Sequence, residues 1–115
     1  MMAVSIENAL YRYEPTPLST GFIYIVSNAG RSTLYIGVTT ELRKRIAAHK
    51  EGYGSAFTNR YNLKDLLYYE GFPTIVEAIA REKQLKKWHS TWKWNLIKAH
   101  NPALKDLSDD LFLNI

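Results

Sequence analysis

The chain has 115 residues, a formal net charge of +4 and no cysteine, and 46% of its residues are hydrophobic against 23% charged. Its length indicates one domain and its composition a globular protein, and the lack of cysteine excludes disulfides, thiolate metal sites and cysteine nucleophiles. It shows neither the apolar run of about 20 residues that a transmembrane helix needs nor a signal-peptide pattern, so we expect no membrane partner and a cytoplasmic location.

The first twenty residues show no clean periodicity, and Pro15 and Pro17 disfavour a helix that reaches them. We therefore expect residues 1–20 to form an N-terminal extension, with a short helix near Val4–Leu10, ahead of the domain itself.

Two runs rich in aromatic and β-branched residues, 22–26 and 33–38, flank a turn-rich segment. They predict an antiparallel hairpin. If the hairpin is symmetric about Ala29–Gly30, Tyr24 lies directly opposite Tyr35, and a slip of one residue would separate the two side chains. The pattern alone allows two interpretations of this pair: half-buried cross-strand packing, or phenols at the rim of a site.

Residues 40–50 have the spacing of a helix, with Thr39 or Thr40 as its cap. A polar loop containing Gly52 and Gly54 follows, and residues 63–70 predict a third strand that ends near Gly71.

The remaining chain predicts two helices and a tail. Thr74 and Glu77 have capping-box spacing, which predicts a helix over residues 75–88, and a further helix is expected from Ser90 to about Asn101. Apolar residues near the C-terminus are expected to pack back on the core. The predicted fold is α+β, a small three-stranded antiparallel sheet flanked by helices in the order β-β-α-β-α-α, over residues 21–108 with a C-terminal tail at 109–115.

Glu82 is out of place on the 75–88 helix. Its spacing puts it on the apolar stripe, whereas Arg81 and Lys83 are expected to lie off that stripe. A buried carboxylate without a partner is costly, so Glu82 is expected to be paired in a structural salt bridge, to bind a metal, or to lie at a cleft edge. The residues of the predicted stripe are Ile75, Ala78, Ile79 and Leu85.

Arg45 and His49 are four residues apart and share one face of the 40–50 helix. An arginine held at the margin of a core suits phosphate binding, because its planar fork can contact two oxygens. The same spacing also fits a surface arginine near an ordinary histidine.

Positive charge concentrates in two central segments. Residues 41–64 carry a net charge of +4 and residues 81–98 a net charge of +5, as a phosphate-binding surface requires, although solvated helix faces give the same pattern. No glycine-rich nucleotide loop or zinc-ligand spacing is present, so no small-molecule cofactor is expected. The side chains expected to contact DNA are Lys44, Lys50, Arg60, Lys83, Lys86 and Lys87.

These residues, in this order, resemble the GIY-YIG nuclease superfamily, and in particular its small stand-alone bacterial members of the excinuclease-subunit-C-like group. The first motif is present as Phe22-Ile23-Tyr24 after Gly21, and the second is intact as Tyr35-Ile36-Gly37. The resemblance covers roughly residues 21–108 and departs from the family pattern at Phe22. The further positions that match the family are Arg45, His49, Glu82 and Asn101.

The resemblance implies a divalent-metal-dependent endonuclease that hydrolyses DNA phosphodiester bonds in DNA repair or processing. Glu82 is then the ligand of Mg²⁺ or Mn²⁺, and Arg45 holds the scissile phosphate. Tyr24 or Tyr35 removes a proton from the attacking water, which requires the site to lower the pKa of a phenol. His49 orients water or phosphate. Gly37 leaves room for close backbone approach, and Asn101 supports the site.

Two other classes remain open at this point. One is a nucleic-acid-binding module of the same fold that cleaves weakly or not at all, and the other is a protein-interaction domain whose aromatic residues form an interface. Because one site cuts one strand, a double-strand break would require a homodimer or successive nicks.

Overall fold

A three-stranded antiparallel sheet in the order β2-β1-β3 organises the computed structural model, which describes residues 10–113. The expected helix near Val4–Leu10 therefore lies outside the described residues, except for Leu10. The strands are β1 (Gly21–Ser27), β2 (Leu34–Thr39) and β3 (Asp65–Phe72), and the helices are α2 (Leu42–Lys50), α3 (Ala56–Arg60), α4 (Ile75–Lys86), α5 (Ser90–His100) and α6 (Ser108–Leu113).

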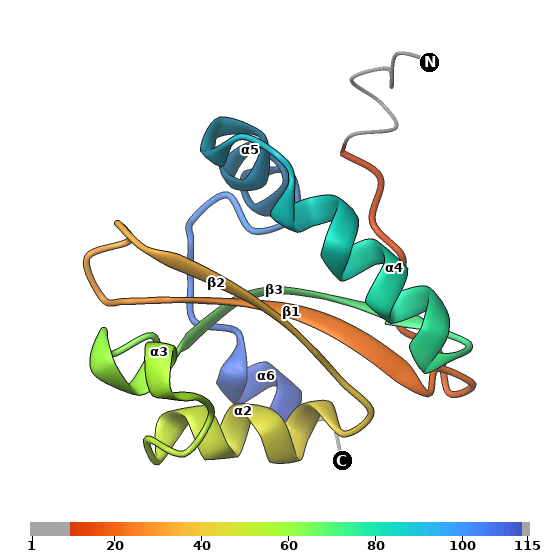
Figure 1. The fold of residues 1–115 in the computed structure, drawn as a ribbon, viewed down its shortest axis with the longest axis horizontal. Helices are drawn as coiled ribbons and strands as arrows, with labels where there is room; N and C mark the ends of the chain where they lie inside the picture. The colour runs from red at the N-terminus through yellow and green to blue at the C-terminus, as the bar shows by residue number, and fades with distance from the viewer. Residues whose placement is uncertain (1–9, 114–115) are drawn as a thin grey trace.

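The sheet is covered on both faces (Figure 1). Helices α4 and α5 lie on one face, and α2, α3 and α6 lie on the other. Each face has its own core: Ile23 and Ile25 belong to the first, and Tyr24 and Val26 to the second. Burial on both faces explains why β1 is an almost continuous run of apolar residues rather than an alternating one.

The predicted fold class is confirmed, since the sheet is antiparallel, three-stranded and flanked by helices. The capping box of α4 is also confirmed, with Thr74 accepting from the Glu77 amide and Glu77 accepting from the Thr74 amide. The caps expected for α2 are wrong: Glu41 is its N-cap without a side-chain hydrogen bond, and Thr39 accepts from the Glu41 amide.

Two elements were not expected. Helix α3 interrupts the predicted polar loop, and its first turn is capped by Ser55, which accepts from the Thr58 amide at 3.1 Å. The C-terminal tail forms α6, which lies beside α2 and whose residues Leu111 and Phe112 pack on the core, as expected of the tail's apolar residues. Helix α6 begins at Ser108 and so crosses the predicted boundary between domain and tail.

Residues 10–20 lie along the outer edge of β3. The Gly71 amide donates to the Tyr13 carbonyl at 2.9 Å, the Thr20 amide donates to the Phe72 carbonyl at 2.8 Å, and the Arg12 side chain donates to the Tyr69 carbonyl at 3.0 Å. These bonds satisfy backbone groups that an open sheet edge would expose. The boundary at residue 20 stays a prediction, but the described part of the extension contacts the sheet. No helix within residues 10–113 has the length and apolar character needed to cross a membrane.

Candidate active site

Tyr24 lies at the centre of the candidate site, on the middle strand and almost completely buried. Its strand partner on β2 is Gly37. A Cβ atom at position 37 would lie 2.7 Å from Cε1 of the Tyr24 ring and would overlap Cζ and the hydroxyl. Glycine is therefore required at 37 because the Tyr24 ring occupies the space of a side chain there, which differs from the expected role of leaving room for a ligand.

The expected register, with Tyr24 opposite Tyr35, is wrong by two residues. Tyr35 pairs with Val26 instead. Since side chains alternate with a period of two, a shift of two keeps both tyrosines on the same face. Their ring centroids lie 6.4 Å apart, so the two phenols are diagonal neighbours rather than direct partners.

His49 connects Tyr24 to α3. Its Nε2 lies 2.8 Å from the Tyr24 hydroxyl and its Nδ1 lies 3.0 Å from Oγ1 of Thr58. The Thr58 hydroxyl in turn donates to the Ser55 carbonyl at 3.3 Å. Because the Thr58 hydroxyl donates to Ser55, the Nδ1 atom of His49 carries the ring proton and donates to Thr58, and its Nε2 atom accepts from the Tyr24 hydroxyl.

Sequence reasoning missed two residues that contact His49, namely Gly54 and Thr58. Gly54 has no space for a side chain because a Cβ there would overlap the His49 ring. Thr58 is 2% exposed. The available signal was the Ser55–Thr58 spacing, which is that of a helix cap.

Burial and neighbouring charges shift the pKa values of this pair in opposite directions. Burial first, and then Tyr35, raise the pKa of Tyr24 to about 12; the Arg45 guanidinium opposes the shift and the Glu82 carboxylate adds to it. Burial and the Arg45 charge lower the pKa of His49 to about 4. Arg45 thus lowers the phenol pKa, as expected of the site, but burial outweighs this effect and the pKa of Tyr24 is raised. At neutral pH both groups are uncharged, which suits a hydrogen-bonded pair in an apolar site.

Arg45 lies on α2, one turn before His49, and is half-buried. Its charge acts on both Tyr24 and His49. Within residues 10–113, no carboxylate forms an ion pair with Arg45. A half-buried guanidinium without an internal counter-charge is suited to bind an anion.

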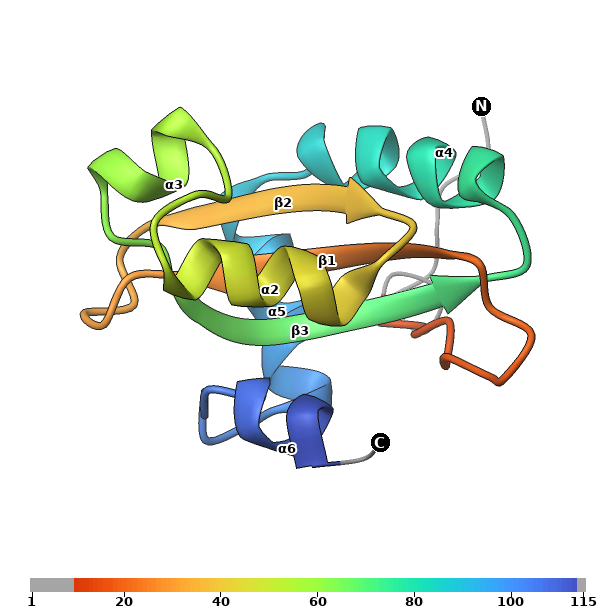
Figure 2. The ribbon, with the colours of Figure 1, turned by 90° about the horizontal axis from the view of Figure 1, so that it is seen from below.

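Glu82 reaches the site from α4. In Figure 2, α4 runs along the β2 side of the sheet. The Glu82 side chain is 15% exposed and pairs with Lys86 at 3.5 Å, and Nζ of Lys86 lies 5.9 Å from the centroid of the Tyr35 ring. Of the three environments expected for Glu82, the structure shows the salt bridge. The partner in that salt bridge is Lys86, which faces Tyr35.

The predicted apolar stripe of α4 contains two errors. Ile79 is 37% exposed, whereas Arg81 is 6% exposed. The Arg81 guanidinium donates to both carboxylate oxygens of Glu70, at 2.8 and 2.9 Å, and Glu70 also accepts from the Tyr68 hydroxyl. This pair lies on the α5 side of the sheet, away from Tyr24.

Asn101 lies at the C-cap of α5. Its amide donates to the carbonyls of Leu67 at 3.0 Å and Lys105 at 2.9 Å and accepts from the Lys105 amide at 3.1 Å. These bonds tie the end of α5 to β3. Tyr24, Tyr35, Arg45, His49 and Glu82 are therefore brought together, whereas Asn101 is placed as a positioning residue of the fold.

The basic side chains expected to contact DNA differ in the ion pairs that they form within the protein. Lys50 pairs with Asp106 and lies 3.6 Å from Asp65, so its charge is largely used within the fold. Lys44 makes an exposed pair with Glu41 at 3.7 Å, which contributes little to stability. The others lie on the surface around α3 and α4: Arg60, Lys83, Lys86 and Lys87.

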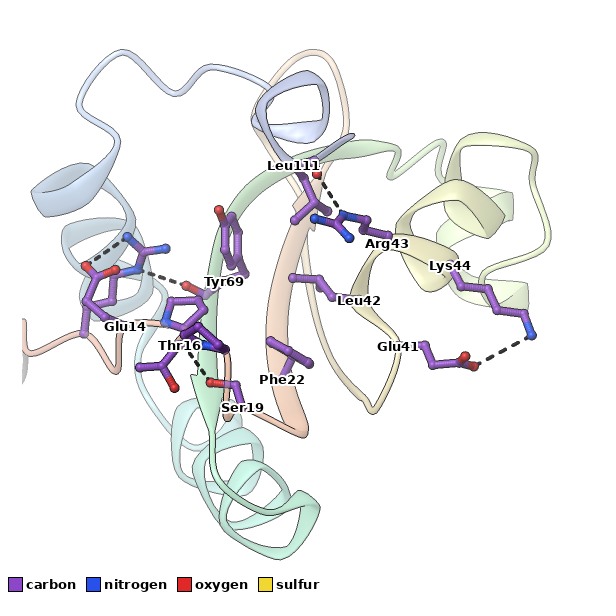
Figure 3. Close-up of a pocket in the computed structure, with 13 residues that line it drawn as sticks. Glu14, Thr16, Ser19, Phe22, Glu41, Leu42, Arg43, Lys44, Tyr69 and Leu111 are labelled. Carbon is purple, nitrogen blue, oxygen red and sulfur yellow. Dashed lines mark hydrogen bonds and ion pairs between the residues drawn. The ribbon is translucent and has the colours of Figure 1, made fainter. Parts of the chain in front are cut away.

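A groove with a volume of about 910 Å³ opens on the same face of the sheet but is lined by other residues (Figure 3). Phe22, Leu42 and Tyr69 form its apolar floor, and Arg43 donates to the Leu111 carbonyl at 3.0 Å across one side. None of Tyr24, Tyr35, Arg45, His49 and Glu82 lines this groove, so it is distinct from the candidate site. Within the described residues, no group of three or more His, Asp or Glu side chains is arranged to hold a metal ion by itself.

Comparisons with known proteins identify the family of the chain. The family model of the GIY-YIG catalytic domain matches residues 20–95. A UPF0213 protein of Pediococcus pentosaceus is 31% identical over 91 residues, covering 79% of this chain and 96% of that protein. A UPF0213 protein of Streptococcus pyogenes serotype M5 is 43% identical over 67 residues, covering 57% of this chain and 71% of that protein. No solved structure gives a significant match.

Proposed function

The chain belongs to the GIY-YIG family, an endonuclease superfamily, and on that premise we propose that it is an endonuclease that hydrolyses DNA phosphodiester bonds with the help of a divalent cation. The observation that carries the proposal is the convergence on one phenol: the Tyr24 hydroxyl is hydrogen-bonded to His49, and the charges of Arg45 and Glu82 both act on it.

Arg45 binds the scissile phosphate in this proposal. Its guanidinium has no internal carboxylate partner among the described residues, and its two-pronged geometry matches two phosphate oxygens. Hydrolysis adds negative charge to the phosphate in the transition state, so a cation fixed beside it lowers the barrier. A bound phosphate also offsets the Arg45 charge, which is one of the two causes of the low pKa of His49.

Tyr24 relays a proton from the attacking water to His49. With a pKa of about 12, the Tyr24 phenol carries its own proton at neutral pH. It can accept a proton from water only if it passes that proton on, and the uncharged Nε2 of His49 lies 2.8 Å away to receive it. His49 becomes a stronger base once an anion sits against Arg45, so the relay operates when substrate is bound.

The fit of a divalent cation rests on Glu82. Mg²⁺ is commonly held by one or two carboxylates while it keeps waters and shares substrate phosphates, so a single carboxylate at the site edge is sufficient. Lys86 forms an ion pair with the Glu82 carboxylate at 3.5 Å. Its side chain is half-exposed, so it can turn away from Glu82 toward solvent or toward a phosphate. When bound, Mg²⁺ or Mn²⁺ would polarise the phosphate and offset its developing charge.

The substrate and role follow from the same features. The basic side chains around α3 and α4 favour DNA as the partner, and the role in DNA repair or processing rests on the resemblance to the excinuclease-subunit-C-like group. A cytoplasmic location and a homodimer remain predictions.

Nicking of supercoiled plasmid in Mg²⁺ or Mn²⁺, with EDTA as the control, tests the proposal. We expect Glu82→Gln to lose about 100-fold or more in nicking rate. Its free energy of unfolding should change by less than about 1 kcal/mol, because the lost pair with Lys86 is partly exposed. Glu14→Gln, the same change at a carboxylate of the N-terminal segment, should nick as the unchanged protein does. DNA binding without metal-dependent nicking would contradict the proposal and favour the non-catalytic module.

A further inference from the structure

Three aromatic rings form a continuous row from the candidate site to the surface of α3, which we name the aromatic ledge: Tyr35, Phe57 and Tyr61. Phe57 stacks on Tyr35 with centroids 6.1 Å apart and planes 28° apart, and Phe57 and Tyr61 are 4.8 Å apart at 50°. Phe57 is 45% and Tyr61 46% exposed. Nearly half of each outer ring therefore faces solvent.

The ledge is continuous with the proposed chemistry. The Tyr35 ring lies 6.1 Å from the His49 ring and 6.4 Å from the Tyr24 ring, centroid to centroid. A group resting on Phe57 is thus one ring away from the site at which the phosphate would bind.

Positive charge borders the ledge at both ends. The Arg60 guanidinium carbon lies 5.5 Å from the centroid of the Tyr61 ring, and Nζ of Lys86 lies 5.9 Å from the centroid of the Tyr35 ring. Exposed aromatic faces between cations match a flat, aromatic group attached to an anionic backbone, which is the chemistry of a nucleotide.

We propose that the aromatic ledge binds an unpaired nucleobase next to the bond that is cut, so that the protein prefers DNA with an unpaired nucleotide over continuous duplex. The inference rests on the proposed function, whose substrate it specifies. In a duplex the faces of each base are covered by its neighbours, whereas an extrahelical or single-stranded base exposes a face that can stack on Phe57. An apolar protein partner would use the rings but gain nothing from Arg60 and Lys86.

Binding measured in EDTA separates this inference from catalysis. The probes are a DNA duplex and the same duplex with one extra, unpaired 2-aminopurine, whose fluorescence falls when the base stacks on an aromatic ring. We expect the full-length protein to bind the bulged duplex more tightly and to quench the 2-aminopurine. Phe57→Leu, which keeps an apolar side chain but removes the ring, should lose about 5- to 100-fold in affinity for the bulged duplex, the range of one stacked base, with little change for the plain duplex.

Trp92→Leu is the matched control, because Trp92 is 47% exposed but lies on α5, across the sheet from the ledge. It should leave both affinities unchanged. Tyr61→Leu repeats the test if Phe57→Leu does not fold. Equal affinity for the two duplexes, or quenching that survives both ledge variants, overturns the inference. Preference for the bulge without nicking in Mg²⁺ would retain the ledge and refute the proposed nuclease, and nicking with no preference would do the reverse.

Discussion

Gly37→Ala is the substitution for which the structure makes the sharpest prediction. The added Cβ atom would lie 2.7 Å from Cε1 of Tyr24 and would overlap the phenol carbon and oxygen. Ordinary contacts begin near 3.4 Å, so Cε1 must move by at least 0.7 Å, and Cζ and the hydroxyl, which lie closer to the added Cβ, must move further. A displacement of 0.7 Å directly away from His49 would stretch the 2.8 Å hydrogen bond to 3.5 Å, the limit of such a bond.

His49 cannot follow the displaced phenol. Its Nδ1 is bonded to Thr58 at 3.0 Å, and the backbone of Gly54 lies directly against its ring. Overpacking costs about 1–3 kcal/mol and an unsatisfied buried polar group about 1–3 kcal/mol, so we expect a loss of about 2–6 kcal/mol in the free energy of unfolding. Misplacing a catalytic group by about 1 Å lowers a rate about 100-fold, so nicking should fall by that factor even where the protein is fully folded.

The assay pairs urea unfolding, followed by tryptophan fluorescence, with plasmid nicking. Gly30→Ala is the control, since its nearest neighbour would be the Asn28 amide at 3.8 Å, an ordinary contact. It should be close to neutral in both measurements. In a Tyr24→Ala background the space at 37 is open, and Gly37→Ala should then have almost no further effect on stability. An equal loss in the two backgrounds would refute the steric reasoning.

Two other predictions concern the charges at the site. Arg45→Ala should lower nicking about 100-fold or more, leave the protein folded, and raise the pKa of His49 measured by NMR, because Arg45 helps to lower it; loss of folding would instead make Arg45 a structural residue. Because the pKa of His49 is about 4 in the folded protein and 6.5 ordinarily, the unfolded chain binds the extra proton between these values. Stability should therefore fall by about 3 kcal/mol as the pH drops from about 6.5 to 4. The slope of unfolding free energy against pH in this window should be shallower in His49→Gln, and identical slopes would contradict a neutral buried His49.

The parts of the fold that the sequence predicted are those with strong local signals. The capping box at Thr74 and the aromatic and β-branched runs of the hairpin each act within a few residues, and the corresponding elements are present. Helix α3 was missed because five residues carry no measurable periodicity. Its stability comes from the cap at Ser55 and from the bond between Thr58 and His49, which is a tertiary contact.

The hairpin register shows why the shared face of Tyr24 and Tyr35 could be predicted although their pairing was wrong. Symmetry about Ala29–Gly30 predicts Ser27 opposite Ser32, but the turn is centred one residue later, at Gly30–Arg31, so every partner on β2 shifts by two and Ser27 pairs with Leu34. An error of one residue would have placed Tyr35 on the opposite face, among Ile23 and Ile25. The error of two preserved the face, but it placed Tyr35 opposite Tyr24, where the structure has Gly37.

Helix α4 shows the limit of periodicity as a guide to burial. Arg81 lies three residues after Ala78 and four before Leu85, and Glu82 lies four after and three before the same two residues. Both charges therefore border one buried stripe, and spacing alone cannot rank them. The two charges differ because of the position of α4 beside β2. Arg81 lies on the border that faces β3, where it donates two hydrogen bonds to the Glu70 carboxylate. Glu82 lies on the border that faces Tyr35 at the β2 edge. Within residues 10–113, Glu82 forms its ion pair with Lys86, whose side chain is half-exposed, and a carboxylate that can exchange its counter-ion is the one suited to receive a metal from solvent.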